Sequence, residues 1–251
     1  RSTPLYSSAA SDVYKRQPTG RLLDEAGVDI VLVGDSLGMV VLGFPDTTHV
    51  TLDHMLHHVE ATARGVKNAL LVGDMPIHSY DTVEQAVQSA KKLFLAGADA
   101  VKLEGGAAQA GNIRAIVEAG IPVVGHIGLL PQKVLEEGGY KIKGKSSAEE
   151  EALVRDVEAV AEAGACAVVV EGVTPHAARQ VTVHSSIPTL GIGSGSHTCD
   201  GDVVVIHDLV GAFPWFIPAF VKPRADVAGS MTAAVKEWME DCYTEPGSIS
   251  S

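Results

Sequence analysis

Three carboxylates stand at or near the ends of three successive apolar runs, and they are the first residues in the chain whose types suggest chemistry. These residues are Asp35, Asp74 and Glu104. Carboxylates gathered without a counter-ion repel one another, whereas Mg²⁺ prefers oxygen ligands and commonly uses one or two carboxylates together with water. Asp is also a frequent first residue of helices, which offers a simpler explanation for any one of them. Taken together, the three predict a Mg²⁺ site formed by Asp35, Asp74 and Glu104.

A lysine precedes the third carboxylate by two positions within an apolar run. Side chains alternate along a strand, so Lys102 and Glu104 would share one face while Val101 and Leu103 share the other. Burying either charge alone would be costly. We therefore expect a partner, a ligand or a metal at that face.

Further polar residues stand at equivalent places along the chain. With those already named, the set is Asp35, Ser36, Asp74, Lys102, Glu104, His126, Glu171, Ser194 and Asp208. The carboxyl ends of the strands of an α/β barrel surround one mouth. The pattern therefore predicts that side chains far apart in the sequence meet at a single site.

The elements that would position these residues alternate between short β-branched runs and amphipathic stretches. Strands are expected at 28–35, 68–74, 98–104, 121–126, 166–171, 187–193 and 203–208. Helices are expected near 51–66, 81–96, 107–119, 147–163 and 174–184, with a terminal helix from about 226 to 242. The strand runs are apolar throughout, which is typical of parallel strands covered on both faces.

Glycines mark the junctions between several of these helices and the strands that follow. Examples are the segments DEAGVD (24–29), LAGADA (95–100), VEAGIP (117–122) and AEAGAC (161–166). A glycine after the last helical turn can adopt the left-handed conformation that ends a helix. Repeated strand-then-helix units predict an α/β fold, and we expect a (β/α)₈ TIM barrel.

The strand count and the start of the chain bear on how complete that barrel is. Seven strands are counted where a barrel has eight, and residues 18–27 read as the end of a helix. We expect residues 1–17 to be a non-native leader standing where the first strand would be, and residues 18–251 to form a single barrel domain. A seven-stranded doubly wound sheet is the alternative, although no dinucleotide-binding loop follows the first strand.

Composition narrows the classes of partner. The chain has 251 residues, 46% of them hydrophobic, and a net charge of −12. That charge argues against nucleic acid as a partner, because a phosphate backbone needs a basic face. The three cysteines match no zinc or redox motif, which favours reduced thiols and a cytoplasmic location. No apolar run has the length of a membrane helix, so we expect no membrane association.

Several longer strings resemble one enzyme family. They are VGDSLGMVVLG (33–43), LVGDMP (71–76), VKLEGG (101–106), VVGHIGLLPQ (123–132), GGYKIKGK (138–145), VVVEGV (168–173) and GIGSGSHTCDGDVVVIHDLVG (191–211). In order and spacing they resemble ketopantoate hydroxymethyltransferase, of the phosphoenolpyruvate/pyruvate-binding barrel superfamily. The resemblance extends from about residue 21 to residue 242.

The resemblance implies an activity and a set of residue roles. Members of the family transfer a hydroxymethyl group from 5,10-methylenetetrahydrofolate to 3-methyl-2-oxobutanoate, which gives ketopantoate for pantothenate and coenzyme A synthesis. It implies that Asp35 and Asp74 coordinate Mg²⁺, with Glu104 joining directly or through water. It further implies an acid/base role for Glu171 and substrate contacts for Asp35, Ser36, Asp74, Lys102 and His126. Residues that bind the folate are not assigned.

The chemistry of these residue types agrees with those roles. A 2-oxoacid can chelate Mg²⁺, which then stabilises the enolate formed when C3 loses a proton. Glu171 could move a proton at C3 or at the folate nitrogen. The resemblance also implies small-molecule substrates and a ring-type homo-oligomer such as a decamer.

Two other functions are kept as alternatives. One is a Mg²⁺-dependent oxoacid carbon–carbon lyase of the same superfamily, although the loop at 131–145 lacks the nucleophilic cysteine that such lyases often carry. The other is an inactive truncated fragment, because the first-strand motif of the family, which contains Tyr-Asp, is not found here.

Overall fold

The computed structural model describes residues 16–244. By their contacts these residues belong to two compact units, 1–205 and 206–251. Most of the predicted leader, 1–17, lies outside the described residues; its last two residues begin the first helix. Within the described range, no helix is both long enough and apolar enough to cross a membrane.

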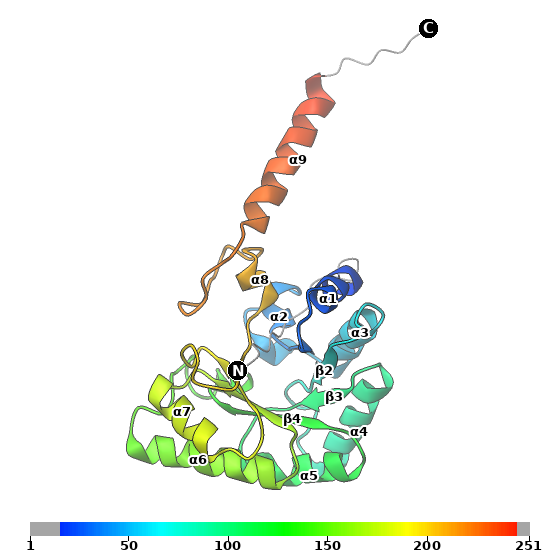
Figure 1. Ribbon diagram of the computed structural model, residues 1–251. Helices are drawn as coiled ribbons and strands as arrows, with labels where there is room; N and C mark the ends of the chain where they lie inside the picture. The colour runs from blue at the N-terminus through cyan, green and yellow to red at the C-terminus, as the bar shows by residue number, and fades with distance from the viewer. Residues whose placement is uncertain (1–15, 245–251) are drawn as a thin grey trace. The chain divides into compact units, whose positions relative to one another are not determined.

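The first unit is built on one parallel sheet whose strands follow each other in chain order (Figure 1). The strands are β1 (Ile30–Val33), β2 (Leu70–Asp74), β3 (Ala100–Lys102), β4 (Val123–Gly128), β5 (Ala167–Glu171), β6 (Thr189–Ile192) and β7 (Gly201–Asp202). Every neighbouring pair is parallel. Parallel neighbours in sequence order are the arrangement of a (β/α) barrel, which confirms the predicted fold class.

Helix α1 (Arg16–Glu25) precedes β1, and further helices connect successive strands from β1 to β6, as parallel pairing requires. In chain order the connecting helices are α2 (Leu37–Val40), α3 (Leu52–Ala63), α4 (Val83–Leu95), α5 (Ala110–Glu118), α6 (Ser147–Glu162) and α7 (Pro175–His184). Three short 3₁₀ helices are η1 (Thr47–His49), η2 (Ala107–Gln109) and η3 (Pro131–Lys133). The helices α4, α5 and α6 lie along one side of the sheet (Figure 1).

The two faces of the sheet carry two different apolar clusters. The larger cluster packs the sheet against the helices and includes Val101 and Leu103 of the β3 segment. The smaller cluster lies on the opposite face and includes Ala100 from the same strand. This alternation confirms that Lys102 and Glu104 share a face with each other and not with Val101 and Leu103.

Glycine is required where α4 turns into β3. Gly97 has a φ of +108°, and a Cβ at this position would lie 2.7 Å from Cβ of Ala63. Both the backbone conformation and the close approach exclude a larger residue. The other three predicted junction glycines, at 27, 120 and 164, also have positive φ. The sequence pattern therefore located these helix ends correctly.

The prediction of a strand at 203–208 was wrong. The last strand covers only Gly201–Asp202, and the amide of Val203 adds one further hydrogen bond to Gly191 O. From Ile206 the chain forms α8 (Ile206–Leu209), with Val210 N donating to Ile206 O. A short apolar run does not distinguish a strand from a buried helical turn.

The second unit contains α8 and the long helix α9 (Val227–Thr244). The helix predicted at about 226–242 is thus present. Asp226 lies just before it and accepts a hydrogen bond from Gly229 N at 2.9 Å. A carboxylate in this position satisfies one of the free amides at a helix N-terminus.

Candidate active site

A hollow of about 100 Å³ lies at the carboxyl ends of the strands of the first unit. Its polar lining residues are Asp35, Ser36, Thr47, Asp74, Lys102, Glu104, His126 and Glu171. The structure therefore brings together all seven residues for which the family resemblance implies catalytic, substrate-binding or metal-binding roles. The first of them in the sequence is Asp35 and the last is Glu171, so they come from segments that are far apart in the chain.

The local sequence of each strand explains how these side chains reach the hollow. On the inner face of β2, β3, β4 and β5, a small or apolar residue precedes a polar residue by two positions. The pairs are Val72 and Asp74, Ala100 and Lys102, Val124 and His126, and Val169 and Glu171. The register sets Asp74 beside Lys102 and His126 beside Val169. The apolar member of each pair supports the sheet, and the polar member faces the mouth.

Lys102 is the ammonium group at the centre of the buried carboxylates. Its Nζ lies 2.9 Å from Asp74 Oδ1 and 3.9 Å from Glu104 Oε1. All three residues are at most 3% exposed. Burial alone would lower the pKa of Lys102, but the neighbouring carboxylates, Asp74 first, raise it above its ordinary value. Lys102 is therefore a permanent positive charge at the base of the hollow.

His126 links this ion pair to the predicted acid/base residue. Nζ of Lys102 lies 3.2 Å from His126 Nδ1, so an ammonium donor there requires Nδ1 to be the unprotonated acceptor. Burial, followed by the charge of Lys102, lowers the pKa of His126 well below its ordinary value. The ring is thus neutral and carries its proton on Nε2, which lies 3.2 Å from Glu171 Oε2. The Nε2–H group can donate a hydrogen bond to Glu171 once the two groups align.

Burial makes three of the carboxyl groups harder to ionise than in water. Burial, and next the charge of Asp74, raise the pKa of Asp35 to about 7. Burial also raises the pKa of Glu104 well above its ordinary range and that of Glu171 to about 7, with Lys102 opposing both shifts. Titratable groups whose pKa is shifted in this way by burial and neighbouring charges are concentrated at functional sites.

The donor set fits a divalent cation. Four carboxyl groups and one ammonium line the hollow, so ionisation of all four leaves an excess of negative charge. Glu104 Oε1 is buried and has no hydrogen-bond partner, and Asp35 Oδ1 accepts none from the described residues. Within 16–244, no three His, Cys, Asp or Glu side chains already surround a common metal position. Mg²⁺ commonly uses only one or two protein carboxylates and completes its coordination with water.

Comparison with known proteins identifies the family. The family model described as ketopantoate hydroxymethyltransferase matches residues 9–246. The chain belongs to this family.

Named relatives agree with the family model. The chain is 49% identical over 225 residues to a 3-methyl-2-oxobutanoate hydroxymethyltransferase of Ignicoccus hospitalis, covering 89% of this chain and 85% of that protein. It is also 49% identical over 226 residues to the protein of the same name from Moorella thermoacetica, covering 89% and 84%.

Solved structures show the wider fold relationship of this ketopantoate hydroxymethyltransferase family member. A 2,3-dimethylmalate lyase of the PEP mutase/isocitrate lyase superfamily aligns with a TM-score of 0.63 at 17% identity, covering 100% of this chain and 87% of that one. A phosphonopyruvate hydrolase in complex with oxalate and Mg²⁺ aligns with a TM-score of 0.63 at 15% identity, covering 97% and 95%. At such identities the likeness concerns the fold alone, so the lyase alternative gains nothing specific from it.

Two other polar residues that end predicted strands do not line the hollow. Ser194 donates a hydrogen bond to Val170 O at 2.7 Å and is almost fully buried, which gives it a role in joining β5 to β6. Asp208 belongs to α8 in the second unit instead of a strand of the sheet. The spacing of polar residues at the predicted strand ends did not indicate that Ser194 bonds to the backbone or that Asp208 lies in a helix.

Sequence reasoning also missed polar residues that are part of the site. Thr47 lines the hollow, and its buried Oγ1 has no hydrogen-bond partner. Gln132 is buried and contacts two of the carboxylates. The available signal for Gln132 was its place at the end of the string VVGHIGLLPQ, within η3 and shortly after β4.

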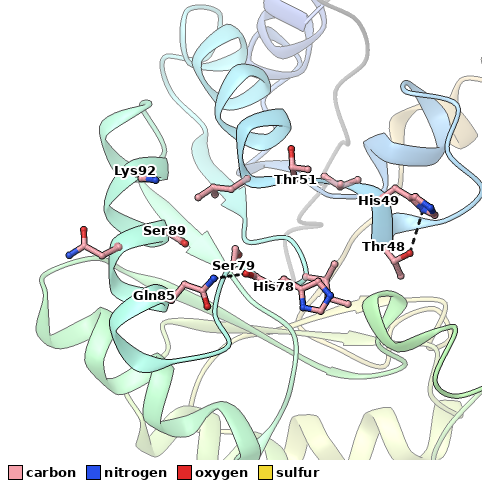
Figure 2. A pocket seen from close by; sticks show the side chains of 12 residues that line it. Thr48, His49, Thr51, His78, Ser79, Gln85, Ser89 and Lys92 are labelled. Atoms are coloured by element: carbon pink, nitrogen blue, oxygen red, sulfur yellow. Dashed lines mark hydrogen bonds between the residues drawn. The ribbon is translucent and has the colours of Figure 1, made fainter.

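A larger hollow of about 410 Å³ lies elsewhere in the first unit, among η1, the start of α3, and α4 (Figure 2). Gln85 Nε2 donates there to His78 O at 2.6 Å, and His78 has a φ of +64°. The lining residues in the described part of the chain include no carboxylate. The smaller hollow therefore remains the candidate active site, because it is where the charged groups converge.

Proposed function

We propose that this protein transfers a hydroxymethyl group from 5,10-methylenetetrahydrofolate to 3-methyl-2-oxobutanoate, forming ketopantoate for pantothenate and coenzyme A synthesis. The observation that carries the proposal is the convergence of Asp35, Asp74, Lys102 and Glu171 on one buried hollow. Membership of the family and the names of the relatives support the same reaction.

Asp35 and Asp74 would hold Mg²⁺ at this site, with Glu104 contributing directly or through water. The fold relative solved with oxalate and Mg²⁺ offers a chemical parallel, since oxalate resembles a 2-oxoacid in presenting adjacent oxygens. When bound, Mg²⁺ supplies Lewis-acid stabilisation of negative charge on the oxygens of the oxoacid.

The protein's own groups bind and orient the oxoacid. The Lys102 ammonium places a positive charge at the base of the hollow, where substrate oxygens carry negative charge. Ser36 also lines the hollow and makes no capping hydrogen bond with α2 through its side chain, so its hydroxyl is available to a ligand. His126 completes the substrate-binding set and contacts both Lys102 and Glu171.

Glu171 would move the proton at C3 of the oxoacid. Water supplies the oxygen: it bonds to the one-carbon unit, both bonds from that carbon to the folate nitrogens break, and the two protons of water pass to those nitrogens. In its carboxylate form Glu171 accepts the proton from C3, and the enolate carbon forms a bond to the released one-carbon unit. The protonated Glu171 then returns its proton to the oxygen of that unit, which becomes the hydroxyl group of the product. Its raised pKa of about 7 suits both roles near neutral pH.

We also propose that the enzyme acts in the cytoplasm as a ring-type homo-oligomer on small-molecule substrates. Three free cysteines and the strongly negative net charge are compatible with a reducing compartment and a protein with no nucleic-acid partner. Size-exclusion chromatography with light scattering tests the oligomer directly: a mass equal to one chain would contradict it.

The activity is tested by incubating the purified protein with both substrates and Mg²⁺ and measuring ketopantoate by mass spectrometry. We expect product that depends on Mg²⁺ and is lost in Asp74→Asn. The matched control is Asp53→Asn, an exposed aspartate on α3, which should retain activity. Formation of no product by the Mg²⁺-loaded parent would overturn the proposal.

A further inference from the structure

Gln132 is tied into the carboxylate cluster by every polar group of its side chain. Its Nε2 donates to Asp35 Oδ2 at 2.8 Å and to Met75 O at 3.0 Å, while Oε1 accepts a hydrogen bond from the hydroxyl of Tyr80. Its backbone amide donates to Glu104 Oε2 at 3.1 Å. The residue is only 4% exposed. One glutamine thus contacts two of the carboxylates proposed to bind Mg²⁺.

The contacts fix which way the Gln132 amide points. Met75 contributes a backbone carbonyl, which can only accept, so the amide group facing it must be the NH₂. The oxygen then faces Tyr80, whose hydroxyl must donate. The second hydrogen of the NH₂ is left for Asp35. Rotating the amide by 180° would place its oxygen against Met75 O and the Asp35 carboxylate, acceptor against acceptor.

Tyr80 is itself held in place. It is almost fully buried, and its backbone carbonyl accepts a hydrogen bond from Asn112 Nδ2 at 2.8 Å. The sequence of contacts therefore runs from Asn112 on α5 through Tyr80 to Gln132 and ends on Asp35. Ligands held by such supporting hydrogen bonds keep the orientation that binding requires.

We propose that Gln132, oriented by Tyr80, is a positioning residue that turns the Asp35 carboxylate so that Oδ1 faces the hollow for Mg²⁺. The geometry supports this because Oδ2 of Asp35 is occupied by Gln132, whereas Oδ1 accepts no hydrogen bond from the described residues. The same residue steadies Glu104 through its backbone amide. This inference rests on the proposed function, in which Asp35 is a Mg²⁺ ligand.

The test is Mg²⁺ binding by isothermal titration calorimetry, without substrates, in the parent and in Gln132→Met. Methionine keeps the length and volume of the side chain but removes its donors and acceptor. We expect the Kd for Mg²⁺ to rise about ten-fold, in line with the loss of a supporting contact to a metal ligand. In the activity assay, saturating Mg²⁺ should restore most of the kcat, because the catalytic groups remain.

Two further variants keep the inference falsifiable if Gln132→Met folds poorly. Tyr80→Phe removes only the hydroxyl that orients the amide, and it should raise the Kd by a smaller factor in the same direction. Gln88→Met, at an exposed position on α4, is the matched control and should leave the Kd unchanged. If the parent binds Mg²⁺ and a folded Gln132→Met or Tyr80→Phe protein binds it with an unchanged Kd, this inference alone is overturned. A parent that does not bind Mg²⁺ would overturn the proposed metal site as well.

Discussion

Replacing Lys102 by methionine tests whether this ammonium stabilises the carboxylates around it. Methionine preserves most of the side-chain volume and removes the charge. Asp74 and Glu104 are at most 3% exposed, and in the metal-free variant they would have no cation beside them. We expect a large loss of stability at alkaline pH and a smaller loss at acidic pH.

The magnitude follows from the distances. At separations of 2.9 Å and 3.9 Å, with an effective dielectric constant of about 20, the attractions of Lys102 to Asp74 and Glu104 are about 6 and about 4 kcal/mol. The cost of burying the ammonium offsets several kcal/mol of this sum. Removing one partner of a buried ion pair typically costs about 3–5 kcal/mol, which we take as the net effect on unfolding. For a chain of this length, that corresponds to a decrease in Tm of about 6–20 °C.

The sign of the pH dependence follows from Asp35 and Glu104. Burial raises the pKa of both groups, that of Asp35 to about 7. In the unfolded chain these carboxyl groups release their protons at their ordinary pKa of about 4, whereas the folded state still binds them above that pH. The parent therefore loses stability as pH rises from about 4 to about 7. Without Lys102 the carboxylates become still harder to ionise, so the deficit of the variant should grow between pH 5 and pH 8.

Thermal unfolding of the metal-free proteins, followed by circular dichroism at pH 5 and pH 8, measures both effects. Lys91→Met, at an exposed position on α4, is the matched control and should change the Tm little at either pH. A Lys102→Met protein with an unchanged Tm at pH 8, or with the same decrease at both pH values, would refute the electrostatic reasoning.

Two other perturbations test the acid/base residue and the backbone that carries it. In Glu171→Gln, the rate of C3 deuteration of 3-methyl-2-oxobutanoate should fall at least about 10²-fold, the usual effect of removing a general base. The parent rate should rise with pH through about 7, as the raised pKa of Glu171 implies, and the variant should lack this limb; an identical pH profile in the variant would assign the proton transfer to another group. In Gly128→Ala, the added Cβ would lie 2.3 Å from Glu171 O at a φ of +96°, so we expect a loss of about 2–4 kcal/mol in the free energy of unfolding. Gly111→Ala on α5 has no atom within 4 Å of its added Cβ and should cost nothing, so equal chemical denaturation of the two variants would contradict the steric argument.

The residues at the strand ends could be predicted from sequence because strand geometry is regular. In four strands a polar residue of the inner face follows a small or apolar one by two positions, as Ala100 precedes Lys102 and Val169 precedes Glu171. Parallel strands then bring their carboxyl ends to the same mouth, even where the residues are far apart in the sequence. The first six parallel strands and the glycine-marked helix ends followed from equally local rules.

Other parts of the site depend on contacts that no local pattern encodes. Gln132 reaches Asp35 across 97 positions and Tyr80 across 52, and nothing in the spacing of these residues connects them. The prediction for 203–208 was wrong for the opposite reason: the β-branched run there fits the local pattern of a strand, although the chain does not form one. Hydrogen bonding instead ended the strand at Asp202 and began a helical turn at Ile206.

The central claim is that the carboxylate-lined hollow binds Mg²⁺ and removes the C3 proton of 3-methyl-2-oxobutanoate. The most direct measurement is solvent deuterium exchange at C3, followed by proton NMR in the presence of Mg²⁺ and without any folate. We expect exchange that requires Mg²⁺ and disappears in both Asp35→Ala and Asp74→Ala. Exchange that persists at the parent rate in these two variants, or its absence from a folded parent that binds Mg²⁺, would contradict the claim.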